Sequence, residues 1–436
     1  MTRHRPLTFP KNFLWGAATA AHQNEGDNAN NDFWRWEHLP GKIADGSTSG
    51  LACDWWDAGR KRAEADLERA AEMGLTGLRL SVEWSRIEPQ PGRFDTAAVD
   101  RYRAILTHLR ALGLTPMVTL HHFTNPLWLA DRGGWLARNT GSLFRRYADY
   151  VVGQLGDLCH LWCTINEPMV YAYQCYLTGA WSPGKKNMAQ TFRAAAAMAK
   201  GHAAARDAIL ARQPDAIVGL AKHIPILDPL TPRLPDRLAA GAQDWLFNRR
   251  FFKRVYRAGS TGDRFVGLNY YGRTSVAFNL RQPAAMFGRH VARPGAEMWQ
   301  PPWAEREIYP RGLYRAIMGA AAFGRPVYIT ENGLDDRDDL RRPRFLLAHL
   351  AAVHRAIQDG ADVRGYYHWT LVDNYEWAEG WTTRFGLVAL NPNTQQRTPR
   401  RSAKLYSAIA GANAITPRLV EEYAPQAMAE IFGGQT

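Results

Sequence analysis

Long apolar runs are missing from this chain of 436 residues. No stretch approaches the ~20 uninterrupted apolar residues that a membrane-spanning helix requires. No apolar signal core precedes Pro10 either, so we expect neither a membrane span nor export. Cysteine is scarce, and its spacing fits no metal-binding motif. We therefore expect a reducing cytoplasm, no zinc, and buried free thiols at Cys53, Cys159, Cys163 and Cys175.

Motifs for binding nucleic acids or nucleotides are also missing, although the net charge is +13. Such a charge is compatible with an acidic partner. However, the basic residues are scattered as pairs, such as Arg145-Arg146 and Arg400-Arg401, and no zinc-finger, Rossmann or P-loop pattern occurs. We interpret the charge as an arginine-rich solvated surface and expect no nucleic-acid partner. The oligomeric state is left open.

Eight strand-like runs alternate with helix-compatible segments, at a mean spacing of about 50 residues, (363 − 12)/7. The runs begin near Asn12, Thr76, Thr115, Cys159, Ala216, Phe265, Pro326 and Val363. Helices are expected over residues 60–73, 97–112, 189–212 and 343–359. The alternation predicts a single α/β domain over residues 1–436, a closed (β/α)8 TIM barrel. Long loops at 24–56 and 273–308 would rim its active face.

Two of these runs end in a carboxylate. The apolar run at 327–333 leads through Thr330 into Glu331, and the run at 161–168 ends in Asn166 and Glu167 before Pro168. The tips of parallel barrel strands are where such folds carry out their chemistry. Two carboxylates that face one sugar ring are what cleavage of a glycosidic bond requires.

The segments TINEP and ITENG resemble the signature pair of the retaining β-glycosidases of glycoside hydrolase family 1, and the resemblance extends from Phe9 to about Arg400. It implies that Glu331 is the nucleophile and Glu167 the acid/base, with carboxyl groups about 5 to 5.5 Å apart. It also implies a small-molecule β-glycoside as substrate, and neither metal nor organic cofactor.

Other strand ends match residues that surround the sugar in this family. Arg79 matches the arginine beside the nucleophile and is expected to depress the pKa of Glu331. Tyr271 matches the tyrosine that hydrogen-bonds the nucleophile, whereas His121 is interpreted as a packing residue. The matched sugar-binding residues are Gln23, His122, Asn166, Asn269, Trp369, Glu376 and Trp377.

Two positions depart from the family pattern on the leaving-group side. Phe123 stands where a tryptophan is usual, and Arg306 stands in for a stacking tryptophan. Trp181, Trp299 or Trp303 would then supply the stacking surface. A positive rim would favour an anionic aglycone.

These features together favour a retaining, β-glucosidase-like enzyme that hydrolyses unphosphorylated β-D-glycosides through a covalent glycosyl-enzyme. A catalytically inactive sugar-binding member of the fold is one alternative, although both glutamates are present. A 6-phospho-β-glycosidase is another, although that branch carries Ser and Lys-x-Tyr in place of Glu376-Trp377. Glu167 argues against a thioglucosidase, which tolerates glutamine there. Glucose, galactose, fucose and mannose all remain open as the glycone.

Overall fold

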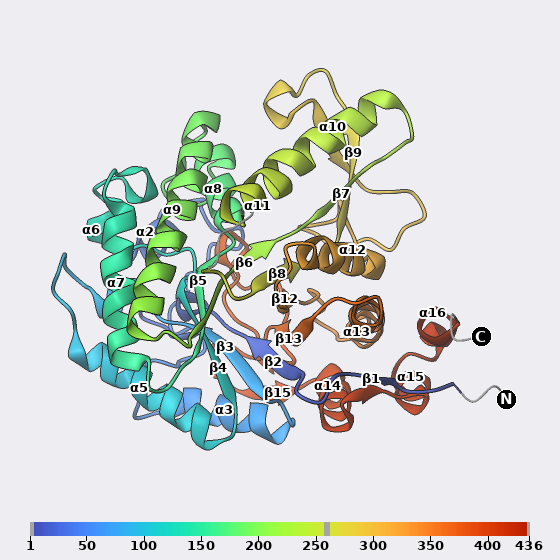
Figure 1. The fold of residues 1–436 in the computed structure, drawn as a ribbon, viewed down its shortest axis with the longest axis horizontal. Coiled ribbons are helices and arrows are strands. Elements are labelled where there is room, and N and C mark those ends of the chain that lie inside the picture. The colour runs from blue at the N-terminus through green and yellow to red at the C-terminus, as the bar shows by residue number, and fades with distance from the viewer. Residues whose placement is uncertain (1–3, 257–261, 434–436) are drawn as a thin grey trace.

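Eight parallel strands close into a barrel in the computed structural model, which describes residues 4–256 and 262–433. Their order around the barrel is β12-β13-β2-β3-β4-β5-β6-β8 (Figure 1). Their bounds are β2 (Leu14–Ala18), β3 (Gly77–Ser81), β4 (Thr115–His121), β5 (Leu161–Asn166), β6 (Ile217–His223), β8 (Val266–Tyr270), β12 (Val327–Asn332) and β13 (Val363–Trp369). Every predicted run becomes a barrel strand that begins within two residues of the expected start, so the predicted (β/α)8 fold is confirmed.

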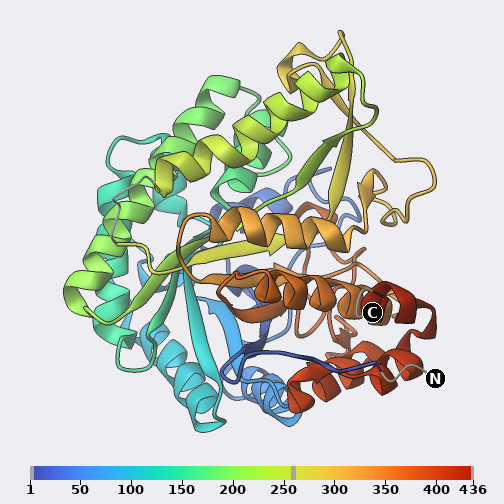
Figure 2. The ribbon, with the colours of Figure 1, turned by 45° about the vertical axis from the view of Figure 1, so that its right-hand side comes forward.

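The barrel strands are buried on both faces, which explains why their sequences are apolar runs and not alternating patterns. Every residue of β3, β5, β8 and β12 is buried. Helices surround the barrel in Figures 1 and 2 and cover the outer face of the strands. The larger ones are α3 (Arg62–Glu72), α5 (Thr96–Ala111), α7 (Thr140–Leu155), α9 (Met188–Arg212), α12 (Pro310–Ala321), α13 (Arg342–Gln358) and α14 (Arg401–Ala412). The four predicted helices are among them.

Local chemistry sets the helix ends that the sequence predicts. Asp95 caps α5 by accepting hydrogen bonds from the backbone N–H groups of Ala97 and Ala98. Gly113 follows the helix with a φ of +78°, a conformation that a residue with a side chain rarely adopts. The chain therefore turns sharply from α5 into β4.

The segment at 273–308, expected as a loop, contains a small sheet instead. β9 (Arg273–Phe278) pairs antiparallel with β10 (Gly288–Val291) and with β11 (Arg306–Glu307), and parallel with β7 (Ile226–Pro229). Helix α10 (Leu234–Asp244) packs against β7 and β9, and the whole unit projects beyond the barrel at the top of Figure 1. The buried side of β9 explains the difference, because it packs beneath α10 and not into the barrel core.

The segment at 24–56 also contains structure that was not expected. It holds the short helix α2 (Asp32–Glu37), which Asn31 caps by accepting from Trp34 N–H. The first barrel strand ends at Ala18, and Gln23 lies beyond it on a helical turn, α1 (Ala21–Asn24). This turn places Gln23 above the barrel mouth rather than within the strand.

Two short strands near the ends of the chain lie side by side. β1 (Leu7–Thr8) pairs antiparallel with β16 (Ala414–Ile415). The neighbouring residue Asn413 accepts a hydrogen bond from the indole N–H of Trp15 in β2 at 2.9 Å. The last part of the chain therefore packs against the first barrel strand.

The four cysteines are buried and free, as predicted. Among the residues that the structure describes, no helix combines the length and the apolar character that a bilayer crossing demands.

Candidate active site

Glu331 is the penultimate residue of β12, and two donors hold its carboxylate. Arg79 of β3 places Nη1 2.5 Å from Oε1, and Tyr271, which directly follows β8, donates its hydroxyl to Oε2 at 2.7 Å. The Arg79 side chain has no exposed surface. Salt and water therefore screen this ion pair much less than they would screen a surface pair.

Glu167 directly follows β5 and begins the short helix α8 (Pro168–Tyr173). Its φ of +44° is uncommon for a residue with a side chain, and strained positions of this kind cluster at functional sites. Asn269 donates its side-chain amide to Glu167 Oε1 at 2.8 Å. No arginine or lysine forms an ion pair with Glu167 among the described residues, so its environment differs from that of Glu331.

A chain of amide contacts joins the two glutamates. Asn269 also donates to Asn166 Oδ1 at 3.1 Å, and that oxygen accepts from Arg79 Nη2 at 2.7 Å. The side-chain oxygen Oδ1 of Asn269 accepts from the hydroxyl of Thr330 at 2.6 Å, one residue before Glu331. Four strands, β3, β5, β8 and β12, are therefore tied together at their carboxyl ends.

Burial raises the pKa of both carboxyl groups, because only 7% of Glu167 and 4% of Glu331 is exposed. Burial, reinforced by the charge of Glu331, brings the pKa of Glu167 to about 8. For Glu331 burial outweighs Arg79 and Tyr271, so the expected depression of its pKa is wrong. Arg79 nevertheless favours the charged form of Glu331, so the first proton lost from the pair leaves Glu331 and Glu167 keeps its own.

The remaining predicted residues line the same end of the barrel. Asn166 contacts His122 Nε2 at 3.1 Å, and the His122 ring stacks near Trp369 and Trp377, with ring centroids 5.9 and 6.1 Å apart. Gln23 donates to Glu376 Oε2 at 3.1 Å. Burial and the charge of Glu331 raise the pKa of Glu376 to about 8. The structure thus brings all eleven predicted site residues into one connected group.

Sequence reasoning missed two residues at the end of β6. Lys222 is buried, contacts the carbonyl oxygen of His223, and lies over the ring of Phe247 with Nζ 4.2 Å from its centroid. Burial lowers the pKa of Lys222 to about 7, although the charge of Glu167 opposes this shift. His223 Nδ1 lies 4.0 Å from Glu167 Oε1. The sequence feature that could have identified these two residues is a Lys-His pair at the end of an apolar strand-like run.

The two departures from the expected pattern occupy different parts of the site. Phe123 packs against Trp377 and Trp181, with centroids 5.2 and 4.9 Å away. Arg306 lies instead beside Trp299 and Trp303. The tryptophans named as substitutes are therefore divided between these two places.

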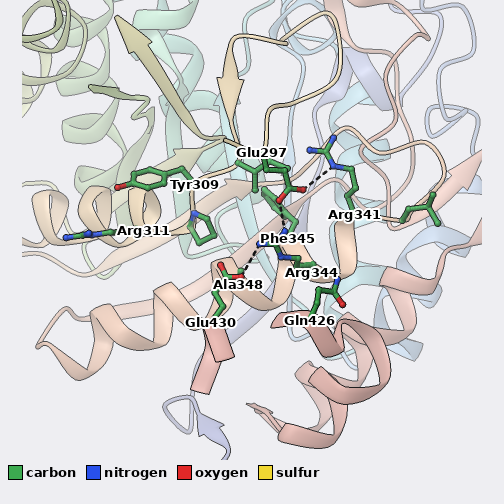
Figure 3. A pocket seen from close by; sticks show the side chains of 12 residues that line it. Glu297, Tyr309, Arg311, Arg341, Arg344, Phe345, Ala348, Gln426 and Glu430 are labelled. Carbon is green, nitrogen blue, oxygen red and sulfur yellow. Dashed lines mark hydrogen bonds and ion pairs between the residues drawn. The ribbon is translucent and has the colours of Figure 1, made fainter. Parts of the chain in front are cut away.

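A separate cavity of about 430 Å³ lies between α12, α13 and the C-terminal helix α16 (Met428–Phe432) (Figure 3). Its lining includes none of the eleven residues. Four of its charged groups pair with one another, since Glu297 bridges Arg341 and Arg344, and Arg344 also reaches Glu430 at 3.2 Å. The cavity therefore adds nothing to the paired-carboxylate site.

The class that fold and site define is a (β/α)8 barrel enzyme with two buried carboxyl groups of unequal environment at the carboxyl ends of its strands. The family model "Glycosyl hydrolase family 1" matches residues 5–263 and 260–415. The chain therefore belongs to glycosyl hydrolase family 1.

Relatives with curated names and solved structures agree with this assignment. The 1,4-beta-D-glucan glucohydrolase of Thermotoga neapolitana is 32% identical over 94% of this chain and 99% of its own. The solved beta-glycosidase from Pyrococcus horikoshii is 38% identical, with a TM-score of 0.87, over 96% of this chain and 98% of its own. A beta-glucosidase from Thermotoga maritima, solved in complex with glucoimidazole, is 30% identical over 94% of this chain and all of its own, with a TM-score of 0.86.

Proposed function

We propose that this enzyme hydrolyses unphosphorylated β-D-glycosides, β-glucosides among them, with retention of the anomeric configuration. The observation that carries the proposal is the inequality of the two buried carboxyls. Arg79 and Tyr271 stabilise the charged form of Glu331, whereas an amide is the hydrogen-bond donor to Glu167. One carboxylate and one carboxylic acid are what the first step of a retaining mechanism needs.

In the first step, a carboxylate oxygen of Glu331 attacks the anomeric carbon while the bond to the glycosidic oxygen breaks. Glu167 gives its proton to that oxygen, and the aglycone leaves as a neutral alcohol or phenol. In the second step, the ionised Glu167 takes a proton from water as the water oxygen attacks the same carbon. The glycosyl–Glu331 bond breaks, and both carboxyls return to their starting states.

The neighbouring residues are proposed to bind the sugar. Gln23 and Glu376 lie within one hydrogen bond of each other, which suits the binding of adjacent hydroxyl groups. Asn166 is fixed by Arg79 and can donate to the 2-hydroxyl, a contact that strengthens in the transition state. The remaining proposed sugar-contacting residues are His122, Asn269, Tyr271, Trp369 and Trp377.

The whole chain, residues 1–436, is proposed to act as one catalytic domain in the cytoplasm. The family match over most of its length and the four free buried thiols support this. Residues 1–3, 257–261 and 434–436 of the proposed domain lie outside the described residues. The mechanism uses no cofactor, and the substrate is a small molecule.

A panel of nitrophenyl β-glycosides tests the proposal. Glucoside, galactoside, fucoside and mannoside are compared on purified protein, and the anomeric configuration of the first product is followed by proton NMR. We expect a β-configured product. A product that first appears as the α-anomer would contradict the covalent mechanism, and binding without turnover of any glycoside would favour the inactive sugar-binding alternative.

A further inference from the structure

Arg306 of β11 is an arginine for which the described part of the chain supplies no counter-ion. Among the described residues, its guanidinium forms no ion pair and donates no hydrogen bond, although its side chain is half-buried. Nearby arginines are paired. Arg273 makes a two-pronged ion pair with Glu307 at 2.8 Å, and Arg344 reaches two carboxylates in the cavity of Figure 3. A cation that is partly removed from water and has no anionic partner is costly, so the presence of Arg306 calls for an external anion.

The position of Arg306 places it next to the reacting groups. A Cβ added at Gly272 would lie only 3.0 and 3.4 Å from Cγ and Cδ of Arg306, so the arginine stem crosses directly over this glycine. Gly272 follows Tyr271, whose hydroxyl binds Glu331. Burial lowers the pKa of the Arg306 guanidinium, and Glu305, Tyr271 and Glu167, each when ionised, oppose this shift, so all three lie near it.

Arg306 lies on the same side of the site as Glu167, the proposed acid/base. The His223 ring, whose charged form the Arg306 cation disfavours, lies 4.0 Å from Glu167 Oε1 and 5.8 Å from the Tyr271 ring centroid. Glu167 donates its proton to the leaving oxygen, so groups beside Glu167 face the leaving group. Arg306 therefore faces the aglycone rather than the sugar.

Aromatic side chains frame the guanidinium. Its Cζ lies 5.2 Å from the Trp299 ring centroid and 5.7 Å from that of Trp303. The two indoles meet edge to face at 85°. The indole N–H of Trp299 is buried and has no hydrogen-bond partner among the described residues. A cation, a free donor and two aromatic faces together form a surface for a flat ring that carries an anion.

We propose that Arg306 binds a carboxylate on the aglycone, and that the preferred substrates of this enzyme are β-glycosides of carboxylated phenols. This inference rests on the proposed glycosidase function. The guanidinium fork matches a carboxylate in two parallel hydrogen bonds, and the tryptophans contact the ring that carries it. Among the acidic groups whose charge acts on Arg306, Glu305 has the largest effect, so it is the competing protein anion to test.

The experiment compares two neutral-sugar substrates, 3-carboxyphenyl and 3-carbamoylphenyl β-glucoside, which differ in charge and little in shape. The readout is the ratio of their kcat/KM values, because the intrinsic reactivity of each leaving group cancels when variants are compared. We expect Arg306→Gln to lower the ratio by ~10-fold or more, the size of a lost charge-assisted contact. Arg306→Lys should retain part of the preference for the carboxylated substrate, and Glu305→Gln should increase that preference.

Arg289→Gln is the matched control, because Arg289 is an exposed arginine on β10 of the same small sheet. It removes the same charge and should leave the ratio within twofold. An equal fall of the ratio in Arg306→Gln and Arg289→Gln would overturn the proposal and indicate general attraction of the anion by the basic surface. Such general attraction would be abolished by 0.5 M salt. The proposal would also be overturned if Arg306→Gln and Arg306→Lys both left the ratio unchanged while circular dichroism showed that both variants were folded. Failure of the wild type to cleave any β-glucoside would instead overturn the proposed function.

Discussion

Arg79 and Glu331 lie 2.5 Å apart across the carboxyl end of the barrel, and the same guanidinium holds Asn166 at 2.7 Å. One cation therefore fixes both the proposed nucleophile and the amide expected to bind the 2-hydroxyl. The contacts come from β3, β5 and β12, so the positions of these groups depend on barrel closure and not on a mobile loop. Groups held on rigid elements in this way need little reorganisation during the reaction.

Substitutions of the two glutamates should have different signatures. Glu331→Ala removes the nucleophile and should abolish turnover of every glycoside. Glu167→Ala should lower kcat/KM for poorly activated aglycones by ~10²- to 10⁴-fold, because proton donation to the leaving oxygen is lost. With 2,4-dinitrophenyl β-glucoside the first step needs little protonation. Rapid-quench kinetics should therefore show a burst followed by slow turnover. A burst in the Glu331 variant instead would reverse the two roles.

The pH dependence should report the state of Glu167. Its pKa is raised to about 8 by burial and by the charge of Glu331, and the protonated form is the one that donates. The value of kcat/KM for phenyl β-glucoside should therefore fall as the pH rises through about 8. For the dinitrophenyl substrate this alkaline fall should be much shallower. If kcat/KM fell equally at high pH for both substrates, a group other than Glu167 would control the fall.

Lys222 should shift the pH at which kcat/KM falls on the alkaline side, which we call the alkaline limb. Removing its partial positive charge in Lys222→Met disfavours the ionised form of Glu167, so the limb should move to higher pH. We expect roughly half a unit, less than a full charge would give, because the pKa of Lys222 is itself only about 7. Lys200→Met, at an exposed position of α9, removes the same formal charge and should leave the profile unchanged. A shift to lower pH in the Lys222 variant would contradict the assignment.

Discrimination against 6-phosphorylated substrates should grow with pH. Glu376 repels a 6-phosphate only as a carboxylate, and its pKa is raised to about 8 by burial and by the charge of Glu331, so it carries only part of its charge near neutrality. The kcat/KM ratio of nitrophenyl β-glucoside to its 6-phosphate should reach at least ~100 at pH 9, equivalent to about 2.7 kcal/mol. It should be smaller at pH 6.

Glu376→Gln separates charge from shape in this comparison. It keeps the side-chain size, and the ratio should then change much less between pH 6 and pH 9, because only the second ionisation of the phosphate, at about pH 6, still contributes. Equal or faster cleavage of the phosphorylated sugar by the wild type at pH 9 would contradict both the role of Glu376 and the choice of substrate class.

The barrel itself was predictable because its strands are buried on both faces, which leaves apolar runs bounded by glycine, proline and asparagine. Glu167 and Glu331 could be identified from the sequence because each is a carboxylate at the end of such an apolar run. The small sheet around β9 was missed, because β10 and β11 are only four and two residues long and their pattern is too short to read.

Electrostatics were the least predictable part of the site. Arg79 beside Glu331 suggests a depressed pKa, yet the pKa is raised, because the sequence names the partner but not the degree of burial. Lys222 looks like an ordinary strand end until the structure places it near Glu167. Arg306 was identified as a departure from a pattern, but only the structure shows that its guanidinium has no protein partner among the described residues.

The pairing of β2 with β13 has a consequence for synthesis on the ribosome. One edge of β2 pairs with β3 soon after both are made, but the other edge must wait for β13, which begins 345 residues after β2 ends (363 − 18). At ~5 to 20 residues per second, this wait lasts about 17 to 70 s. During that time an unpaired strand edge is open to mispairing with other nascent chains. Cover of this edge until β13 emerges would prevent such mispairing, and the sugar site cannot assemble until Trp369 and Glu376 have emerged.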